Sequence, residues 1–227
     1  MTAWDAQYRD PAAAPPVPDT YGILITTIPH RHARLCELLA ELDRQWQRGV
    51  GVLVYRDNLE APVGVKRQAL LEASRAAYVS FIDDDDQVAP FFIPRIMNAL
   101  STGPDYVGFK ARCWDKGDPA SVAEHSLRYE GWHTWPEKLV RDFSHLNPMR
   151  RELALLGRFT GDDLEDHNWA EQIRKAGAVH TEEWIPEIMY EYRFDIDDCH
   201  RTKRSPMHEE FIPALPSYPW LTVLETR

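Results

Sequence analysis

The sequence predicts an α/β protein with a mixed, mostly parallel sheet flanked by helices in a single domain. As far as residue 86, apolar runs of strand length alternate with segments of helical periodicity. Such alternation favours parallel strands joined by right-handed crossovers. An acidic run at residues 83–86 directly follows the third apolar run, and the length of 227 residues suits one domain.

The first half of the chain is predicted to hold three strands and two helices. Short runs rich in β-branched and aromatic residues at 23–28, 50–55 and 78–82 are typical of buried strands. A helix is expected between the first two runs, ending at Gly49, and another over 64–77. The apolar positions that recur at helical spacing in the first helix are Leu35, Leu38, Leu39, Leu42 and Trp46.

The second half is less regular in sequence. Helices are predicted over 90–100 and 164–176, and strands over 106–111 and 188–192. Residues 113–145 are rich in Trp, His and charged side chains, which indicates irregular structure around a pocket.

Composition limits the classes of function. The net charge of −10 disfavours broad, non-specific binding to nucleic acid, which needs a basic surface. Cys36, Cys113 and Cys199 are far apart and form no CxxC pair, so neither a disulfide framework nor a zinc site is expected. Residues 1–19 lack the apolar core of a signal peptide, and no apolar run reaches the roughly 18 residues that span a membrane. A cytoplasmic location is therefore expected.

The acidic run at 83–86 is the strongest functional signal in the sequence. Four adjacent carboxylates repel one another, and a bound cation would offset that repulsion. Ligands of open α/β sheets bind beyond the carboxyl ends of the strands, where this run lies. Oxygen ligands suit Mg²⁺, Mn²⁺ or Ca²⁺, although a solvated acidic turn is the alternative.

Common nucleotide and calcium motifs are absent from the sequence. It contains neither GxGxxG after the first strand nor GxxxxGK[ST], so a dinucleotide-binding fold and a P-loop are not supported. The spacing of an EF-hand loop also fails, because Val88 stands where that loop needs glycine.

Residues 65–86 resemble the signature of family-2 glycosyltransferases with the GT-A fold. In that family an Arg-Asn pair opens a helix that leads into a strand ending in Leu-Asp-x-Asp-Asp. Element order extends the resemblance over residues 22–195, and it implies a GT-A, Rossmann-like sheet. The matching positions are Arg67, Asp83, Asp85 and Asp86, whereas Gln68 and Ala76 depart from the usual Asn and Gly.

A second segment, 161–169, resembles the Glu-Asp motif at the start of the acceptor-side helix of that family. The resemblance implies catalytic roles for Glu165 and Asp166, with Asp166 as the general base. The alternative is an ordinary acidic helix N-terminus, which the helix dipole also favours.

The resemblance also implies roles on the donor side. Asp83 would hold the donor ribose and Asp85 a Mn²⁺ or Mg²⁺ ion, and Asp86 would either orient them or bind the ion through water. His200 is a candidate second metal ligand, with a surface histidine as the alternative. The full set expected to contact the donor is Thr27, Pro29, Arg31, Asp57, Arg67, Asp83 and Asp84.

On the acceptor side, His145, Arg150 and Trp132 are expected to line the pocket. Aromatic rings such as Trp132 can stack on a sugar or on a nucleobase. Solvated basic residues before a helix are the alternative for the segment that holds His145 and Arg150.

These expectations divide the chain into parts. Residues 1–20 are interpreted as a flexible lead-in, 21–204 as the GT-A domain and 205–227 as a Pro-rich tail that wraps the surface. Within the domain, 21–112 would bind the nucleotide sugar and 113–204 the acceptor.

The predicted function is metal-dependent, inverting transfer of one sugar from a nucleotide-sugar donor, with a UDP-sugar favoured, to an acceptor hydroxyl. The acceptor is left open between a DNA base, a protein and a glycan. One alternative is a phage-type DNA glycosyltransferase acting on hydroxymethylated bases in the host cytoplasm. The alternatives of another class are a nucleotidyltransferase and a non-catalytic module that binds nucleotide sugars.

Overall fold

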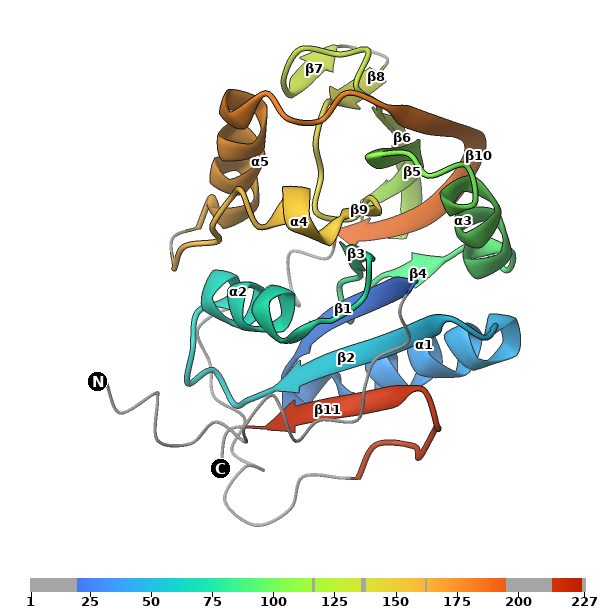
Figure 1. The fold of residues 1–227 in the computed structure, drawn as a ribbon. Coiled ribbons are helices and arrows are strands. Elements are labelled where there is room, and N and C mark those ends of the chain that lie inside the picture. Colours follow the sequence, from blue (N-terminus) through green and yellow to red (C-terminus); the bar gives the residue numbers. More distant parts are fainter. Residues whose placement is uncertain (1–19, 116, 136–137, 162, 195–213, 226–227) are drawn as a thin grey trace, which may run out of the picture.

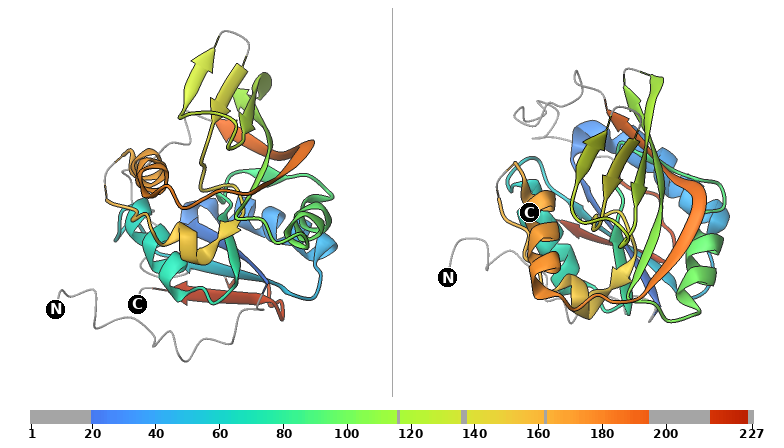
Figure 2. Two further views of the ribbon diagram at one scale, coloured as in Figure 1. Left: turned by 45° about the horizontal axis from the view of Figure 1, so that its top comes forward. Right: turned by 90° about the horizontal axis from the view of Figure 1, so that it is seen from above.

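A computed structural model confirms the α/β class, with one mixed sheet of eleven strands and helices against both of its faces (Figures 1 and 2). The strand order is β11-β2-β1-β3-β9-β5-β6-β8-β7, and β10 pairs with β4 and β5. The structure describes residues 20–115, 117–135, 138–161, 163–194 and 214–225.

The first half forms the parallel part of the sheet, as predicted. β1 lies between β2 and β3 and is parallel to both, and every residue of β1 and β2 is buried. The carboxyl ends of these strands therefore share one edge, with Thr27 opposite Arg56. The elements are β1 (Tyr21–Thr27), η2 (Pro29–Arg31), α1 (His32–Gln45), β2 (Val50–Arg56), α2 (Val63–Ala73) and β3 (Tyr78–Phe81).

Two hydrophobic cores lie on opposite faces of the sheet. Alternate residues of β1 point to each face, so Ile23 packs with α1 and α3 while Leu24 packs with α2 and α5. The later elements are β4 (Gln87–Val88), α3 (Phe92–Leu100), β5 (Tyr106–Asp115), β6 (Asp118–His125), β7 (His133–Trp135), β8 (Lys138–Arg141), β9 (Met149–Arg150), α4 (Arg151–Ala154), α5 (Glu165–Ala176) and β10 (Glu182–Phe194).

The prediction of irregular structure over 113–145 is wrong. β5 continues to Asp115, and β6, β8 and β7 extend the sheet beyond it (Figure 1). Most of β6 is only partly buried or exposed, so it lacks the apolar run that marks a central strand. Pairing with β5 and β8 stabilises it instead, and a single sequence does not display that pairing.

The tail also differs from the prediction. Within 205–227, β11 (Leu221–Glu225) adds a parallel edge strand beside β2, and Trp220 is buried with its indole nitrogen 3.1 Å from Asp43. The alternation of Leu221 and Val223 toward one core with Leu224 toward the other is the strand signal. None of the described helices combines the length and apolar character that crossing a membrane requires.

Candidate active site

The acidic run follows β3 at the edge where β1 and β2 also end (Figure 1). Its four carboxylates have different surroundings. Asp84 and Asp86 are buried, at 2% and 3% exposure, whereas the side chains of Asp83 and Asp85 remain 23% and 18% exposed. Of the four, only Asp83 and Asp85 therefore keep part of their side chains exposed, and we call the surface around Asp83, Asp85 and Asp166 the crevice.

Asp84 anchors the loop after β1. It accepts hydrogen bonds from the Thr27 hydroxyl at 2.6 Å and from the Arg31 guanidinium at 2.8 Å. Burial raises the pKa of Asp84, and these partners oppose the rise. Thr27 and Asp84 were expected to contact the donor, but both are buried and bond to each other, so they shape the site from behind.

Asp86 ties the acidic run to β10. The Tyr190 hydroxyl lies 2.7 Å from one carboxylate oxygen, and the backbone amide of Arg193 lies 2.6 Å from the other. Burial, followed by repulsion from Asp83 and Asp85, raises the pKa of Asp86 well above its usual range. These two bonds fix the carboxylate of Asp86 against β10.

Asp85 points into the crevice and forms an ion pair with Arg31 at 2.9 Å. Burial, together with repulsion from Asp84 and Asp83, raises the pKa of Asp85 to about 6 despite the attraction of Arg31. Burial and the two neighbouring carboxylates therefore both disfavour the ionised form of Asp85. Arg31 is the last residue of η2 and the N-cap of α1, so this turn after β1 brings a cation to the acidic run.

Arg67 connects the two acidic motifs. This α2 residue, 6% exposed, donates to Asp83 at 2.6 Å and pairs with Glu165 at the start of α5. Burial alone would raise the pKa of Asp83, but Arg67, aided by His145, holds it well below its usual range. Glu165 is buried against Arg67 and does not reach the crevice, so it positions the helix rather than contacting substrates.

Gly64 allows this connection. A Cβ atom at Gly64 would lie 1.8 Å from the backbone oxygen of Thr160 and 2.9 Å from the Cβ of Glu165, so only glycine permits such close packing of α2 against the start of α5. The approach places Asp166, the next residue of α5, at the mouth of the crevice with 26% of its side chain exposed.

His145 lies between the donor carboxylate and the candidate base. Its Nε2 is 3.8 Å from Asp83 and its Nδ1 is 3.8 Å from Asp166. The side chain is 5% exposed, and neither ring nitrogen has a hydrogen-bond partner within 3.5 Å. A buried imidazole without partners is costly, so its position between two carboxylates suggests bonds that shorten when substrates bind.

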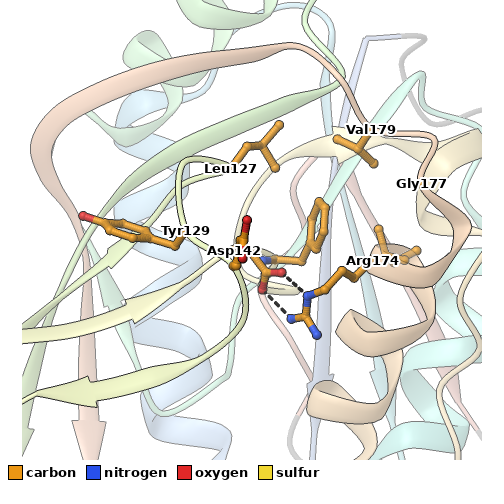
Figure 3. Close-up of a pocket in the computed structure, with 9 residues that line it drawn as sticks. Leu127, Tyr129, Asp142, Arg174, Gly177 and Val179 are labelled. Carbon is orange, nitrogen blue, oxygen red and sulfur yellow. Dashed lines mark hydrogen bonds and ion pairs between the residues drawn. The ribbon is translucent and has the colours of Figure 1, made fainter.

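A second ion pair fixes the far end of α5 to the segment that follows β8 and leads to His145. Arg174 donates to Asp142 at 2.7 Å (Figure 3), and Gly177 ends the helix at φ 61°. A cavity of about 180 Å³ lies beside this pair, lined in part by Leu127 and Val179. No residue of the acidic run lines this cavity.

The remaining predicted residues fall at different places. Asp57 is buried, with its oxygens 2.7 Å from Lys66 and 2.8 Å from the Ala61 amide, so it braces the loop after β2 and does not face the donor. Trp132 packs against His167 of α5, with 5.2 Å between the ring centres.

Arg150 was expected to line the acceptor pocket, but the structure places it elsewhere. Arg150 is opposite Tyr78, the first residue of β3, and forms an ion pair with Asp105 at 3.2 Å. It therefore lies at the end of β3 away from the acidic run and does not line the acceptor pocket. His200 lies outside the described residues.

Sequence reasoning missed three residues that hold the site. Lys66 neutralises Asp57, and Tyr190 and Arg193 hold Asp86. Tyr190 was part of a predicted strand, but its role depends on β10 lying beside β4, which is a contact across more than 100 residues of chain.

The family model for glycosyl transferase family 2 matches residues 34–155. Solved structures of S. aureus TarS share the fold: TarS 1–349 has a TM-score of 0.59 at 14% identity over 77% of this chain and 60% of TarS 1–349. Its complex with UDP-GlcNAc has a TM-score of 0.60 at 15% identity over 78% of this chain and 59% of the other. The chain thus spans about three-fifths of these structures, and no curated protein sequence matches it. The expected GT-A class is confirmed.

Proposed function

We propose that this chain, which belongs to glycosyltransferase family 2, transfers one sugar from a UDP-sugar to an acceptor hydroxyl with inversion at the anomeric carbon. One observation carries the proposal. His145 lies 3.8 Å from both the candidate base Asp166 and the donor-edge carboxylate Asp83, which Arg67 holds in place. The TarS complex with UDP-GlcNAc, which has the same fold, supports a UDP-sugar as donor.

A divalent cation fits the chemistry of Asp85. This carboxylate is partly accessible, and repulsion from Asp84 and Asp83 adds to burial in raising its pKa; a bound cation would offset that repulsion. In the described ranges, no three His, Cys, Asp or Glu side chains are grouped to hold a metal ion. Mg²⁺ sites often use one or two carboxylates and complete their ligands with substrate phosphates. When bound, the ion would stabilise charge on the departing diphosphate.

The protein residues then account for the proton and the leaving group. Asp166 accepts the proton of the acceptor hydroxyl, whose oxygen forms a bond to C1 of the sugar. The bond between C1 and the phosphate oxygen breaks, and the nucleoside diphosphate leaves with that electron pair. A single displacement of this kind inverts the anomeric centre, and no second carboxylate nucleophile is needed. Arg31, released from Asp85, can pair with the diphosphate.

A thermal-shift screen tests the donor and the metal. The protein is mixed with UDP-, GDP-, TDP- and CDP-sugars, each with Mn²⁺ or with EDTA. A ligand that binds the folded state raises the melting temperature by mass action, so a UDP-sugar is expected to raise it only with Mn²⁺. Asp85→Ala should lose this shift, whereas Asp163→Ala, an exposed residue outside the site, should keep it. Equal shifts in EDTA would refute metal dependence.

Anomeric configuration provides the second test. With UDP-GlcNAc as donor, NMR of the product formed with an accepted alcohol is expected to show the β-anomer, since the donor is the α-anomer. Retention of the α configuration would refute single displacement.

A further inference from the structure

Arg141, the last residue of β8, is a cation on the acceptor side of the crevice that pairs with no carboxylate in the described part of the chain. Its guanidinium instead lies 4.1 Å from the centre of the Trp132 ring. The side chain is partly buried. By contrast, Arg31, Arg67 and Arg174 each form ion pairs. Stacking of a guanidinium on an indole is favourable and holds it in one orientation.

The strand register shows which way Arg141 points. It is the direct partner of His125 across β6 and β8, and His125 is the partner of Phe109 across β5. Directly paired residues project from the same face of a sheet.

The same face leads from Phe109 to the acidic run. Cys113 lies four residues after Phe109 on β5, so the two side chains project from the same face. Cys113 is the direct partner of Tyr192 on β10. Tyr190, two residues from Tyr192, bonds to Asp86. Arg141 therefore projects from the face of the sheet that looks onto the acidic run. The electrostatics agree: burial raises the pKa of Tyr192, the charges of Asp83, Asp86 and Asp85 raise it further, and Arg141 opposes the rise.

The neighbours of Arg141 lie beside the candidate base. The Trp132 ring that carries Arg141 makes an edge-to-face contact with His167, which directly follows Asp166 on α5. On the donor side, Arg31 belongs to η2, which follows β1, and Arg67 belongs to α2, which precedes β3. Arg141 is thus linked through Trp132 to the start of α5, which carries Asp166.

We propose that Arg141, held on Trp132, binds an anionic group of the acceptor, so that the acceptor is a hydroxyl compound that carries a phosphate or a carboxylate. This inference rests on the proposed glycosyl transfer. The planar guanidinium offers paired donors that match the two oxygens of either group. The anion would form the ion pair that Arg141 does not form with any described carboxylate. Binding it there would orient the acceptor hydroxyl toward Asp166.

Binding of matched small molecules tests the proposal. Calorimetry with the full chain, saturated with UDP and Mn²⁺, compares glucose with glucose 6-phosphate and glucuronate. We expect the wild-type protein to bind one or both anionic probes at least tenfold more tightly than glucose. Arg141→Gln should abolish that preference, and Arg141→Lys, which keeps the charge but not the paired donors, should retain part of it. Comparing glucose 6-phosphate with glucuronate then shows whether the site prefers a phosphate or a carboxylate.

The controls separate this proposal from its premise. Arg44→Gln removes an exposed arginine that pairs with Glu41 on its own helix and should leave the preference unchanged. Circular dichroism and melting temperature confirm that Arg141→Gln is folded. The proposal is overturned if the wild-type protein shows no anionic preference, or if Arg141→Gln keeps it. If UDP fails to bind while the anionic preference depends on Arg141, the assigned donor fails and the anion site stands.

Discussion

The two sides of the crevice differ in how their charges are balanced. On the donor side, Arg31 pairs with Asp84 and Asp85, and Arg67 pairs with Asp83 and Glu165. On the acceptor side, Arg141 rests on an indole ring with no ion pair among the described residues.

This difference indicates that the donor side is organised before substrates arrive. Buried ion pairs fix the carboxylates in place, although removing one partner of such a pair is strongly destabilising. The acceptor side is held by stacking and leaves a cation available to a ligand. Substitutions on the donor side should therefore weaken folding and donor binding. Substitutions on the acceptor side should reduce turnover and change the choice of acceptor.

The largest expected effect comes from the base between the two sides. Asp166→Asn keeps the shape of the side chain but cannot accept a proton, so kcat should fall by about 10²–10⁴-fold. The Kd of the UDP-sugar, measured by calorimetry, should change little. Asp163→Asn, an exposed carboxylate just before α5, is the matched control. Full activity in Asp166→Asn would show that another group is the base.

A buried cation on the donor side should matter most for folding. Arg67→Met leaves Asp83 and Glu165 without their shared partner, so the free energy of unfolding should fall by about 3–5 kcal/mol. Urea denaturation measures this loss. Arg44→Met, which breaks an exposed pair on α1, should cost about 0–1 kcal/mol. Equal losses in the two variants would contradict the contrast between buried and exposed pairs.

His145 joins the two sides, so its removal should separate turnover from binding. His145→Phe preserves ring packing against Phe81, which lies 6.1 Å away between ring centres, but removes both nitrogens. If His145 positions Asp166, kcat should fall by about 10²-fold while the KM for the donor stays within a few-fold. A variant whose donor KM alone increases would make His145 a donor-binding residue instead.

A smaller effect concerns stability at acid pH. Burial, with a contribution from the nearby charge of Arg141, lowers the pKa of His125 to about 3, against the hydrogen bond to Asn147. The unfolded chain binds a proton near pH 6.5 and the folded chain does not, so stability falls as pH drops from 6.5 toward 3. Between pH 6.5 and pH 5 the loss is about 2 kcal/mol. His125→Asn should remove this part of the pH dependence in urea titrations, and an unchanged profile would refute it.

Local patterns in the sequence were sufficient for the parallel half of the fold. Apolar runs predicted β1, β2 and β3, and the acidic run marked the edge of the sheet because it follows β3 directly. The Glu-Asp segment was correctly placed at the start of α5. These features depend on residues close together in the chain, which is why periodicity and motifs could reveal them.

The features that were missed depend on long-range pairing. β6, β8 and β11 are stabilised by neighbours distant in sequence. The direction of the Arg141 side chain is set by its pairing with His125 and by its contact with the Trp132 ring, and neither can be read from the sequence. Likewise, Asp57 and Glu165 have the residue type of a donor ligand and a base, but burial beside Lys66 and Arg67 gives them structural roles.

The most direct test of the two-sided account is the Kd of a UDP-sugar in calorimetry, measured with Mn²⁺ and with EDTA on the wild-type protein, Asp85→Ala and Arg141→Gln. The account predicts that EDTA and Asp85→Ala each weaken binding at least tenfold, while Arg141→Gln leaves the Kd within about twofold of the wild-type value. A large loss in Arg141→Gln, or binding that ignores both EDTA and Asp85→Ala, would contradict the separation of the two sides.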